Sequence, residues 1–393
     1  MSNSSPASTG FRALLRRSVR ELTSRRMYLW AMVLVPVAVA FFFLSLMGIG
    51  LPQRVPTAVV DMDHTNLSTK VTRSLSSQQY VEITDVLSSY RDAMDKVQSG
   101  EIFGFFYIPR DFERDALGGT GTTITYYTNL TYFVPGTLAY KAFKTMAVTS
   151  SGAIVQGELT GMGVTSQMAG VILQPVVITP HGIGNPWLNY NVYLSNSFLP
   201  CVLQLMIFLV TVWSICHEMK TGRSVEWLRV ANGSIIRALA GKLLPQTVIF
   251  LIVGFAIQAL CFRYNHFPMN GSWAAMSLAT VLLVIASQAF GVIMASLIPN
   301  LRLSLSLCSL TGILAFSVAG FSFPVDHMYG AIGVFSYILP IRYYFLIYID
   351  QALNGIDVYY SRLYFVGLLA FPMVAMLVAR NLRRFCLKPA YEP

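Results

Sequence analysis

Two groups of acidic residues in this chain have the types and the spacing that could do chemistry. Asp61, Asp63 and His64 carry the oxygen and nitrogen atoms that metal ions accept as ligands. One short cluster without a second group of ligands is more often a turn at the end of a strand, in which carboxylates accept backbone N–H groups. The second group, in the stretch 111–115, has the spacing of a solvated helix face. We therefore expect no catalytic site, no metal site and no bound cofactor.

The composition places much of the chain in a membrane. Hydrophobic residues make up 54% of the 393 residues and charged residues only 12%, about half the charged share of a soluble protein. A water-soluble fold of this length would lack the charge to cover its surface, which excludes an ordinary cytosolic enzyme. A net charge of +10 would suggest a nucleic-acid partner in a soluble protein. In a membrane protein it records which side the loops face.

Six segments are apolar and long enough to cross a bilayer core of about 30 Å. They cover residues 27–51, 197–216, 243–262, 273–298, 303–323 and 363–379. A further apolar stretch, within the segment 324–350, contains Pro340 and Arg342. Because proline disfavours a straight helix, we interpret this segment as re-entrant. A seventh full span is the competing interpretation, and it would place the two chain ends on opposite sides.

Polar side chains inside the spans are few. Charge is nearly absent there, which disfavours a proton-coupled carrier. Gln204, Gln258 and Gln288 are expected to hold helices together rather than to bind a substrate. The five cysteines all lie in or beside spans, so we interpret them as small hydrophobic residues rather than as disulfide or metal ligands.

The distribution of charge predicts the direction of the chain. The segments on the side of the N terminus carry 16 basic and 4 acidic residues, whereas those on the other side carry 12 basic and 14 acidic residues. Because basic residues favour the cytoplasmic side of a membrane, both termini are predicted to be cytoplasmic, including a tail at 381–393. Six spans satisfy that parity. The charge thus reflects topology, and we expect no nucleic-acid partner.

Residues 52–196 form one long extracytoplasmic insertion between the first two spans. The pattern predicts strands at 57–61, 80–84, 102–108 and 122–128, with helices at 66–79 and 89–99 and a short helix after Pro109. Strands that alternate with helices indicate an α/β domain with a largely parallel sheet. Residues 133–172 are expected to be mostly helical, and 176–179 to return as a last strand.

The segment 217–242 is too short for a catalytic domain, yet it is patterned. Ser224 or Thr221 can cap a helical turn. Within that turn Val225, Leu228 and Val230 place apolar groups on one side, beside Trp227. Two interpretations follow from these residues. The segment is either an interfacial loop held by lipid headgroups or a docking helix for a cytoplasmic partner.

The spacing in this loop resembles the ABC type-2 exporter permeases, whose first cytoplasmic loop reads E-x-x-x-G-T-x-E-x-L. Counted from Glu218, the glycine, the second glutamate and the leucine correspond to Gly222, Glu226 and Leu228. The motif's threonine is replaced. Three further stretches, at 60–68, 100–113 and 323–340, resemble the large-ectodomain branch of the same family. The family's proline after the methionine of the last stretch is Tyr329 here.

The resemblance implies a six-helix subunit of the bacterial inner membrane that pairs with a second permease subunit and two cytoplasmic ATPases. A coupling helix would then contact the ATPase through Glu218, Gly222, Glu226, Trp227 and Leu228. The chain contains no G-x-x-x-x-G-K-[ST] loop, so ATP hydrolysis is expected on a separate chain.

An amphipathic helix is predicted within residues 1–26, with four basic residues around an apolar face: Arg12, Arg16, Arg17 and Arg20. From the residues alone it is a basic anchor on membrane lipid. The resemblance implies a connecting helix, and both descriptions can hold at once.

The resemblance also implies export of an amphiphilic or hydrophobic substrate, such as a drug, a lipid or a lipid-linked glycan, along spans two and five. Pro324, Pro340 and Arg342 are our candidates for an outer gate, with a structural hairpin as the alternative. Related exporters often use a periplasmic adaptor, which no residue here specifies. The competing function is a membrane receptor or sensor that binds a ligand with its outer domain and signals through a partner.

Overall fold

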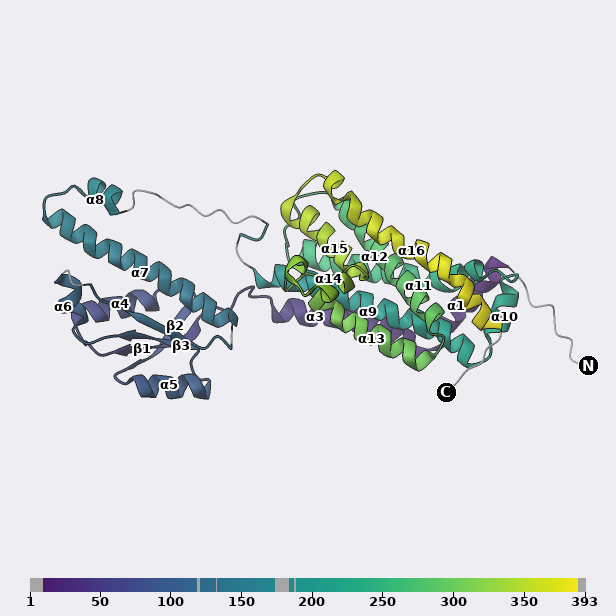
Figure 1. The fold of residues 1–393 in the computed structure, drawn as a ribbon, viewed down its shortest axis with the longest axis horizontal. Helices are drawn as coiled ribbons and strands as arrows, with labels where there is room; N and C mark the ends of the chain where they lie inside the picture. The colour runs from purple at the N-terminus through teal and green to yellow at the C-terminus, as the bar shows by residue number, and fades with distance from the viewer. Residues whose placement is uncertain (1–9, 119–120, 132, 174–183, 187–188, 388–393) are drawn as a thin grey trace, which may run out of the picture. The chain divides into compact units, whose positions relative to one another are not determined.

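The computed structural model, drawn in Figure 1, describes residues 10–118, 121–131, 133–173, 184–186 and 189–387. The chain forms two units, one comprising Met1–Gly50 and His181–Pro393 and the other comprising Leu51–Pro180. The first unit is a helical bundle with a hydrophobic core, and the second is an α/β unit with buried apolar residues on both faces of its sheet. This confirms the predicted polytopic membrane fold with an inserted α/β domain.

Six helical segments among the described residues are long and apolar enough to cross a membrane, as predicted. The first is continuous from α2 (Arg26–Leu29) through the π-helical turn η1 (Trp30–Leu34) to α3 (Val35–Leu46). The other five are α9 (Tyr190–Lys220), α11 (Ile235–Gln258) with its π-helical extension η2 (Ala259–Tyr264), α12 (Trp273–Leu297), α13 (Leu301–Val318) and α16 (Val358–Leu387).

Helix α9 begins at Tyr190, well before the apolar run that the sequence assigned to this span. Its first turns are polar, so hydropathy placed the boundary too late. The Asn189 side chain caps the helix by accepting a hydrogen bond from the N–H of Asn191. Farther along, the buried Asn196 amide donates to the Tyr348 hydroxyl at 3.1 Å. These polar groups tolerate burial because each has a partner.

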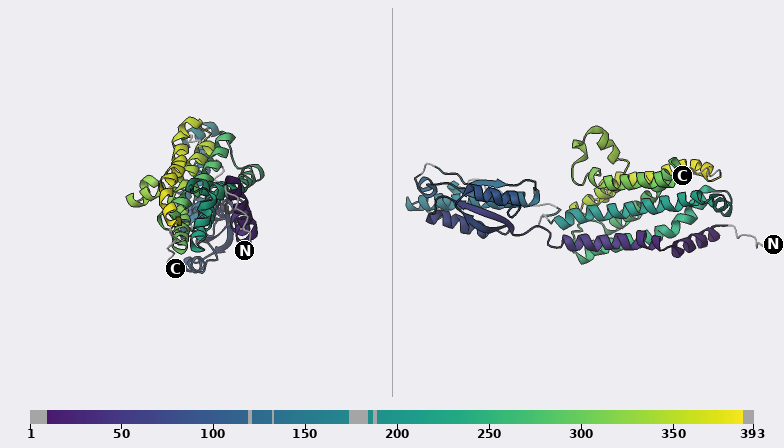
Figure 2. Two further views of the ribbon diagram at one scale, coloured as in Figure 1. Left: turned by 90° about the vertical axis from the view of Figure 1, so that its right-hand side faces the viewer. Right: turned by 90° about the horizontal axis from the view of Figure 1, so that it is seen from below.

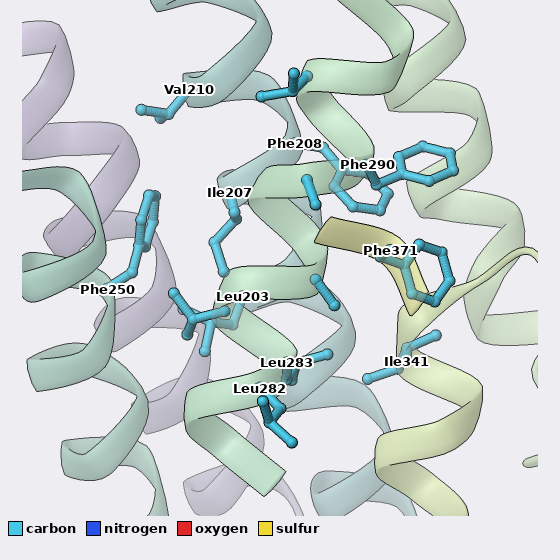
Figure 3. Close-up of a cluster of buried hydrophobic side chains, with 14 of the residues drawn as sticks. Leu203, Ile207, Phe208, Val210, Phe250, Leu282, Leu283, Phe290, Ile341 and Phe371 are labelled. Atoms are coloured by element: carbon cyan, nitrogen blue, oxygen red, sulfur yellow. The ribbon is translucent and has the colours of Figure 1, made fainter. Parts of the chain in front are cut away.

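Helices α9 and α12 form the centre of the bundle and are its most buried spans. Phe208 and Phe290 stack between them with ring centroids 4.5 Å apart, as Figure 3 shows. A side chain at Gly291 would place its Cβ 2.9 Å from Thr211, so the two helices approach closely only because this position is glycine. Side chains from α11, α15 and α16, including Phe250, complete the apolar cluster of Figure 3.

Gln204, Gln258 and Gln288 join helices, as predicted. Gln288 on α12 accepts a hydrogen bond from the Thr247 hydroxyl of α11 at 2.7 Å. Gln258 on α11 donates to the Met276 carbonyl of α12 at 3.1 Å. Gln204 on α9 accepts from the backbone N–H of Ile341 at 2.8 Å, which satisfies a donor that the start of a helix leaves free.

A bent pair of helices follows α13. The turn η3 (Val325–His327) leads to α14 (Gly330–Ser336), and α15 (Pro340–Tyr348) with its extension η4 (Ile349–Asn354) departs from α14 at 80°. The two arms, of 7 and 15 residues, reach only about 10 and 22 Å at a helical rise of 1.5 Å per residue, less than the thickness of a bilayer core. In the right-hand view of Figure 2 the green segment after α13 stands off the side of the bundle.

Both ends of this bent segment lie at the end of the bundle where α9 and α12 begin. Before it, the Phe321 carbonyl accepts a hydrogen bond from the hydroxyl of Tyr193, in the first turn of α9. At its end, the Leu353 carbonyl of η4 accepts one from the Asn270 amide, just ahead of α12. The segment therefore enters and leaves at one end of the bundle, as a re-entrant segment does, and not at opposite ends, as a seventh span would require.

In its described residues, the α/β unit contains a four-stranded sheet in the order β2-β1-β3-β4. Strand β1 (Val55–Asp61) pairs in parallel with β2 (Val81–Leu87) and β3 (Gly104–Ile108), and β4 (Thr125–Thr128) joins β3 antiparallel. The largely parallel sheet predicted from the sequence is thus confirmed. The predicted strand at 176–179 lies outside the described residues.

Helices cover both faces of this sheet. Val59 and Phe106 pack toward α4 (Asn66–Ser76), α6 (Phe112–Leu117) and α7 (Phe133–Gly161), whereas Val60 and Phe105 pack toward α5 (Tyr90–Ser99). Neighbouring strand residues can serve two cores because their side chains alternate between faces. Helix α8 (Ser166–Leu173) follows α7.

Candidate functional site

The described ends of the chain meet at one short helix, α10 (Ser224–Val230). The backbone N–H of Gly10, which precedes α1 (Phe11–Ser24), donates to the Val230 carbonyl at 3.1 Å. The Ser224 hydroxyl donates to the Cys386 carbonyl near the end of α16 at 2.9 Å. Helix α10 also contacts α9 and α11, and Figure 1 shows α1 and α10 at the same end of the bundle.

A buried ion-pair cluster lies beneath α10. The Lys242 ammonium of α11 is 2.8 Å from a carboxylate oxygen of Glu218 on α9 and 3.0 Å from one of Glu21 on α1. The other oxygen of Glu218 accepts a hydrogen bond from the Arg17 guanidinium at 2.9 Å. The Lys242 and Glu218 side chains are only 3% exposed. One network of charges therefore joins three helices.

The electrostatics of this cluster depend on its completeness. Removing charged groups from water costs several kcal/mol each, and only close pairing offsets that cost. The second Glu21 oxygen accepts from the Tyr28 hydroxyl at 3.2 Å, and the Lys242 ammonium lies 5.3 Å from the centre of the Trp227 ring, a further favourable contact. Loss of one member would leave a buried charge without its partner.

Helix α1 packs directly on α11. A side chain at Gly241 would place its Cβ 2.6 Å from the Cβ of Leu14, so the contact requires glycine. The Ser18 hydroxyl donates to the Lys242 carbonyl at 2.8 Å. Two apolar side chains of α1, Phe11 and Val19, are 44% and 48% exposed. Leu14 and Ser18 of α1 are thus buried against α11, whereas Phe11 and Val19 do not pack fully against the rest of the bundle.

The five residues of the predicted coupling segment fall into two groups. Glu218, Trp227 and Leu228 are 2–3% exposed, so they cannot touch a partner directly. Glu226 has a 59% exposed side chain. Gly222 has φ +68°, a left-handed conformation that favours glycine, and it forms the turn between α9 and α10.

The four predicted basic residues of α1 also separate. Arg17 belongs to the buried cluster, whereas Arg12, Arg16 and Arg20 are exposed. Sequence reasoning missed the partnership of Arg17, Glu21 and Lys242 and assigned the lysine to a loop. A signal was available, because a lysine flanked by the apolar residues of a span predicts a buried acidic partner.

The candidate outer-gate residues lie around the bent segment. Pro324 is exposed and precedes η3, whereas Pro340 is buried as the first residue of α15. The Arg342 guanidinium stacks on the Tyr337 ring, 4.6 Å from its centre, and donates to the Ala319 carbonyl at 3.4 Å. Arg342 thus links the end of α13 to the bend, which gives it a structural role whether or not the segment moves.

The carboxylates after β1 act as caps, as the sequence favoured. Asp61 is 5% exposed and accepts hydrogen bonds from the N–H groups of Asp63 and His64. Asp63 accepts from the N–H groups of Phe112 and Glu113, both at 3.0 Å, and so caps α6. In the part of the chain that the structure describes, no group of three His, Cys, Asp or Glu side chains could hold a metal ion.

The environment of Asp63 favours its charged form. Partial burial opposes ionisation, but hydrogen bonds from the Thr65 hydroxyl and from the N–H groups of α6 outweigh that effect. The pKa of Asp63 is therefore below its ordinary value.

Together, six apolar helices and the bent segment that follows α13 describe a polytopic membrane protein, with a charge-linked helix at one end of its bundle. A family model described as ABC-2 family transporter protein matches residues 26–379, and the chain therefore belongs to that family. No curated protein matches the chain. The family identifies a membrane-embedded transport subunit, which works in partnership with an ATPase.

Proposed function

We propose that this chain is the permease subunit of an ATP-driven exporter of the large-ectodomain branch. It pairs with a second permease subunit, receives mechanical work from two cytoplasmic ATPases through α10, and extrudes an amphiphilic or hydrophobic substrate. The observation that carries the proposal is the construction of α10, which exposes one face and packs the other against four helices.

The exposed face of α10 is suited to a protein partner. Val225 is 45% exposed beside the acidic side chain of Glu226, and together they offer a small apolar contact and a charge. The opposite face inserts Trp227 and Leu228 into the core. A push on α10 would reach α1, α9, α11 and α16 together, because close-packed side chains transmit displacement.

Glu218 has a different role in this proposal. Its contacts with Lys242 and Arg17 join α9, α11 and α1, so the carboxylate keeps the helices together when the ATPases pull on α10. We assign partner contact to Val225 and Glu226, and internal coupling to Glu218.

The distribution of basic residues between the two ends of the bundle supports a cytoplasmic position for α10. Helix α1, α10 and the end of α16 lie at one end of the bundle, and this end carries the excess of basic residues counted in the sequence. By the positive-inside rule it faces the cytoplasm. The proposal therefore places both termini inside, the α/β unit outside, and the protein in the bacterial inner membrane. There the α/β unit is free to meet a periplasmic adaptor.

An apolar groove supports a hydrophobic or amphiphilic substrate. It has a volume of about 670 Å³ and lies between the first span, α9 and α13, with Met27, Leu209, Trp213, Leu310 and Ile313 among its lining residues. Spans two and five, expected to line the path, provide most of these residues. The re-entrant segment with Pro340 and Arg342 is the proposed outer gate.

The function is tested by co-purification with a candidate cytoplasmic ATPase, chosen as a soluble chain that carries a G-x-x-x-x-G-K-[ST] loop. Val225→Asp combined with Glu226→Ala should reduce ATPase recovery and substrate-stimulated hydrolysis by about tenfold or more, because the partner loses an apolar contact and a charge. The free energy of unfolding should stay within about 0.5 kcal/mol of the wild-type value, because both side chains are exposed.

Arg302→Ala, at an exposed position at the start of α13, is the matched control and should leave ATPase recovery unchanged. If the α10 variant recovers as much active ATPase as wild type, α10 is not the coupling helix and the proposal fails.

A further inference from the structure

A cavity of about 370 Å³ lies between α1 and α10. It adjoins the ion-pair cluster and shares Arg17 and Glu21 with it. Five arginines line it: Arg16, Arg17, Arg20, Arg25 and Arg223. Its only acidic lining residues are Glu21 and Glu226. The cavity is concave and positively charged, which is the combination that concentrates anions.

The two glutamates do not neutralise this cavity. Glu21 already receives the Lys242 ammonium at 3.0 Å and the Tyr28 hydroxyl. Glu226 is 3.9 Å from Arg17, a distant pair. Within the described residues no carboxylate forms an ion pair with the other four arginines. These four guanidinium groups, from α1, its C-terminal boundary and the start of α10, remain available to an anion.

The position of the cavity indicates where such an anion would come from. Helix α1 ends at Ser24, and the first span starts at Arg26. Leu29 and Trp30, one turn into that span, are 55% and 60% exposed. Trp is enriched at the boundary between headgroups and hydrocarbon. The basic cavity therefore lies at the depth of lipid phosphates, an assignment that rests on the membrane orientation proposed above.

We propose that this cavity binds the phosphate of an anionic phospholipid. Guanidinium groups match phosphate geometry with paired N–H donors. A phosphate held by Arg16 and Arg20 of α1 and by Arg223 beside α10 would cross-link the two helices and relieve repulsion among their charges. The lipid is thus a structural part of the junction between α1 and the coupling helix.

The test uses the full chain purified in a non-ionic detergent, without ATPase, and measures lipid adducts by native mass spectrometry. Phosphatidylglycerol is titrated in parallel with phosphatidylcholine, and inorganic phosphate is the competitor. Wild type should retain phosphatidylglycerol in preference to phosphatidylcholine. Arg16→Gln combined with Arg223→Gln should weaken that retention by about tenfold or more, because two basic contacts are lost.

Arg12→Gln combined with Arg229→Gln is the matched control. It removes one exposed arginine from α1 and one from α10, and neither lines the cavity. Retention should therefore change less than about twofold. Arg17 is left intact because its loss would disturb the cluster around Glu218. A thermal unfolding measurement confirms that each variant is folded.

If both double variants lose phosphatidylglycerol retention equally, the effect is one of general charge, and the proposal of a lipid site in this cavity is wrong. Retention unaffected by the cavity variant would overturn it as well. Displacement of the lipid by an equimolar amount of inorganic phosphate would assign the cavity to a free anion and overturn the lipid assignment. Because no ATPase is present, these outcomes are independent of the ATPase co-purification that tests the proposed function.

Discussion

The two units of this protein each bury a carboxylate, and they stabilise it in different ways. Asp61 in the α/β unit accepts hydrogen bonds from two N–H groups and the Ser68 hydroxyl, all within seven residues along the chain. Glu218 in the helical bundle is paired with Lys242 and Arg17, which are 24 and 201 residues away. The first carboxylate is satisfied by local dipoles, and the second by charges on distant helices.

This difference indicates how far along the structure each buried carboxylate exerts its stabilising effect. A local cap shapes one strand-to-helix turn and affects little beyond it. A buried ion pair between helices makes the position of each helix depend on the others, because separating them exposes unpaired charge. The ion-pair cluster therefore ties the positions of three helices together at the end of the bundle where α10 lies, whereas the aspartates of the α/β unit maintain only the fold of that unit.

The largest expected effect is from Lys242→Met. This change leaves Glu218 and Glu21 without their shared cation and should destabilise the bundle by about 3–5 kcal/mol. All five cysteines are buried and unpaired, so a thiol-reactive dye in a thermal ramp reports unfolding. Arg229→Met, at an exposed position of α10, should change the midpoint little. Glu218→Gln added to Lys242→Met should recover part of the loss, and an unchanged midpoint for Lys242→Met alone would contradict the ion-pair argument.

A smaller and local effect is expected from Asp61→Ala. Three donors lose their acceptor, and the penalty for an unmatched buried group is about 1–3 kcal/mol. Hydrogen exchange should rise at residues 63–68, while the thiol-dye midpoint stays unchanged because every cysteine lies in the helical unit. Asp95→Ala, an exposed position on α5, is the control. A shift of the bundle midpoint would mean that the two sites are not as separate as we argue.

The smallest effect is a pH dependence of the α6 cap. Because the pKa of Asp63 is lowered in the folded state from its ordinary 3.8, its contribution is fully present above about pH 4 and is lost as pH falls through the folded value. Hydrogen exchange at residues 112–117, corrected for the intrinsic rate at each pH, should therefore increase below pH 4. Asp63→Asn should remove this pH dependence, and wild-type protection that persists unchanged to pH 2 would refute the assignment.

Much of the fold could be predicted because its signals are local. The six spans follow from runs of apolar residues, and the parallel sheet follows from alternation of strands and helices. The cap at Asp61 was predictable for the same reason, since donor and acceptor lie a few residues apart. The start of α9 was missed because its first turns are polar and are paired only through the fold, as with Asn196 and Tyr348.

The predicted coupling segment also combines features that the sequence reveals with features that only the fold reveals. Its motif located Glu218 and Glu226 by spacing, but spacing does not reveal which carboxylate is buried. The Glu218 side chain is 3% exposed and the Glu226 side chain is 59% exposed, so only Glu226 can meet a partner at the surface. Arg17 looked like one of several equivalent basic residues until α1 was seen to pack on α11.

By itself the sequence determined the membrane class, the number of spans, the inserted α/β domain and the absence of a nucleotide-binding loop, because composition, periodicity and short motifs encode them. Tertiary structure alone decided which charges pair and which face of α10 stays free. It also decided that, among the described residues, four of the five arginines lining a cavity have no carboxylate partner. The physical reason is that pairing depends on distances between helices far apart in the chain, and these are set only when the bundle packs.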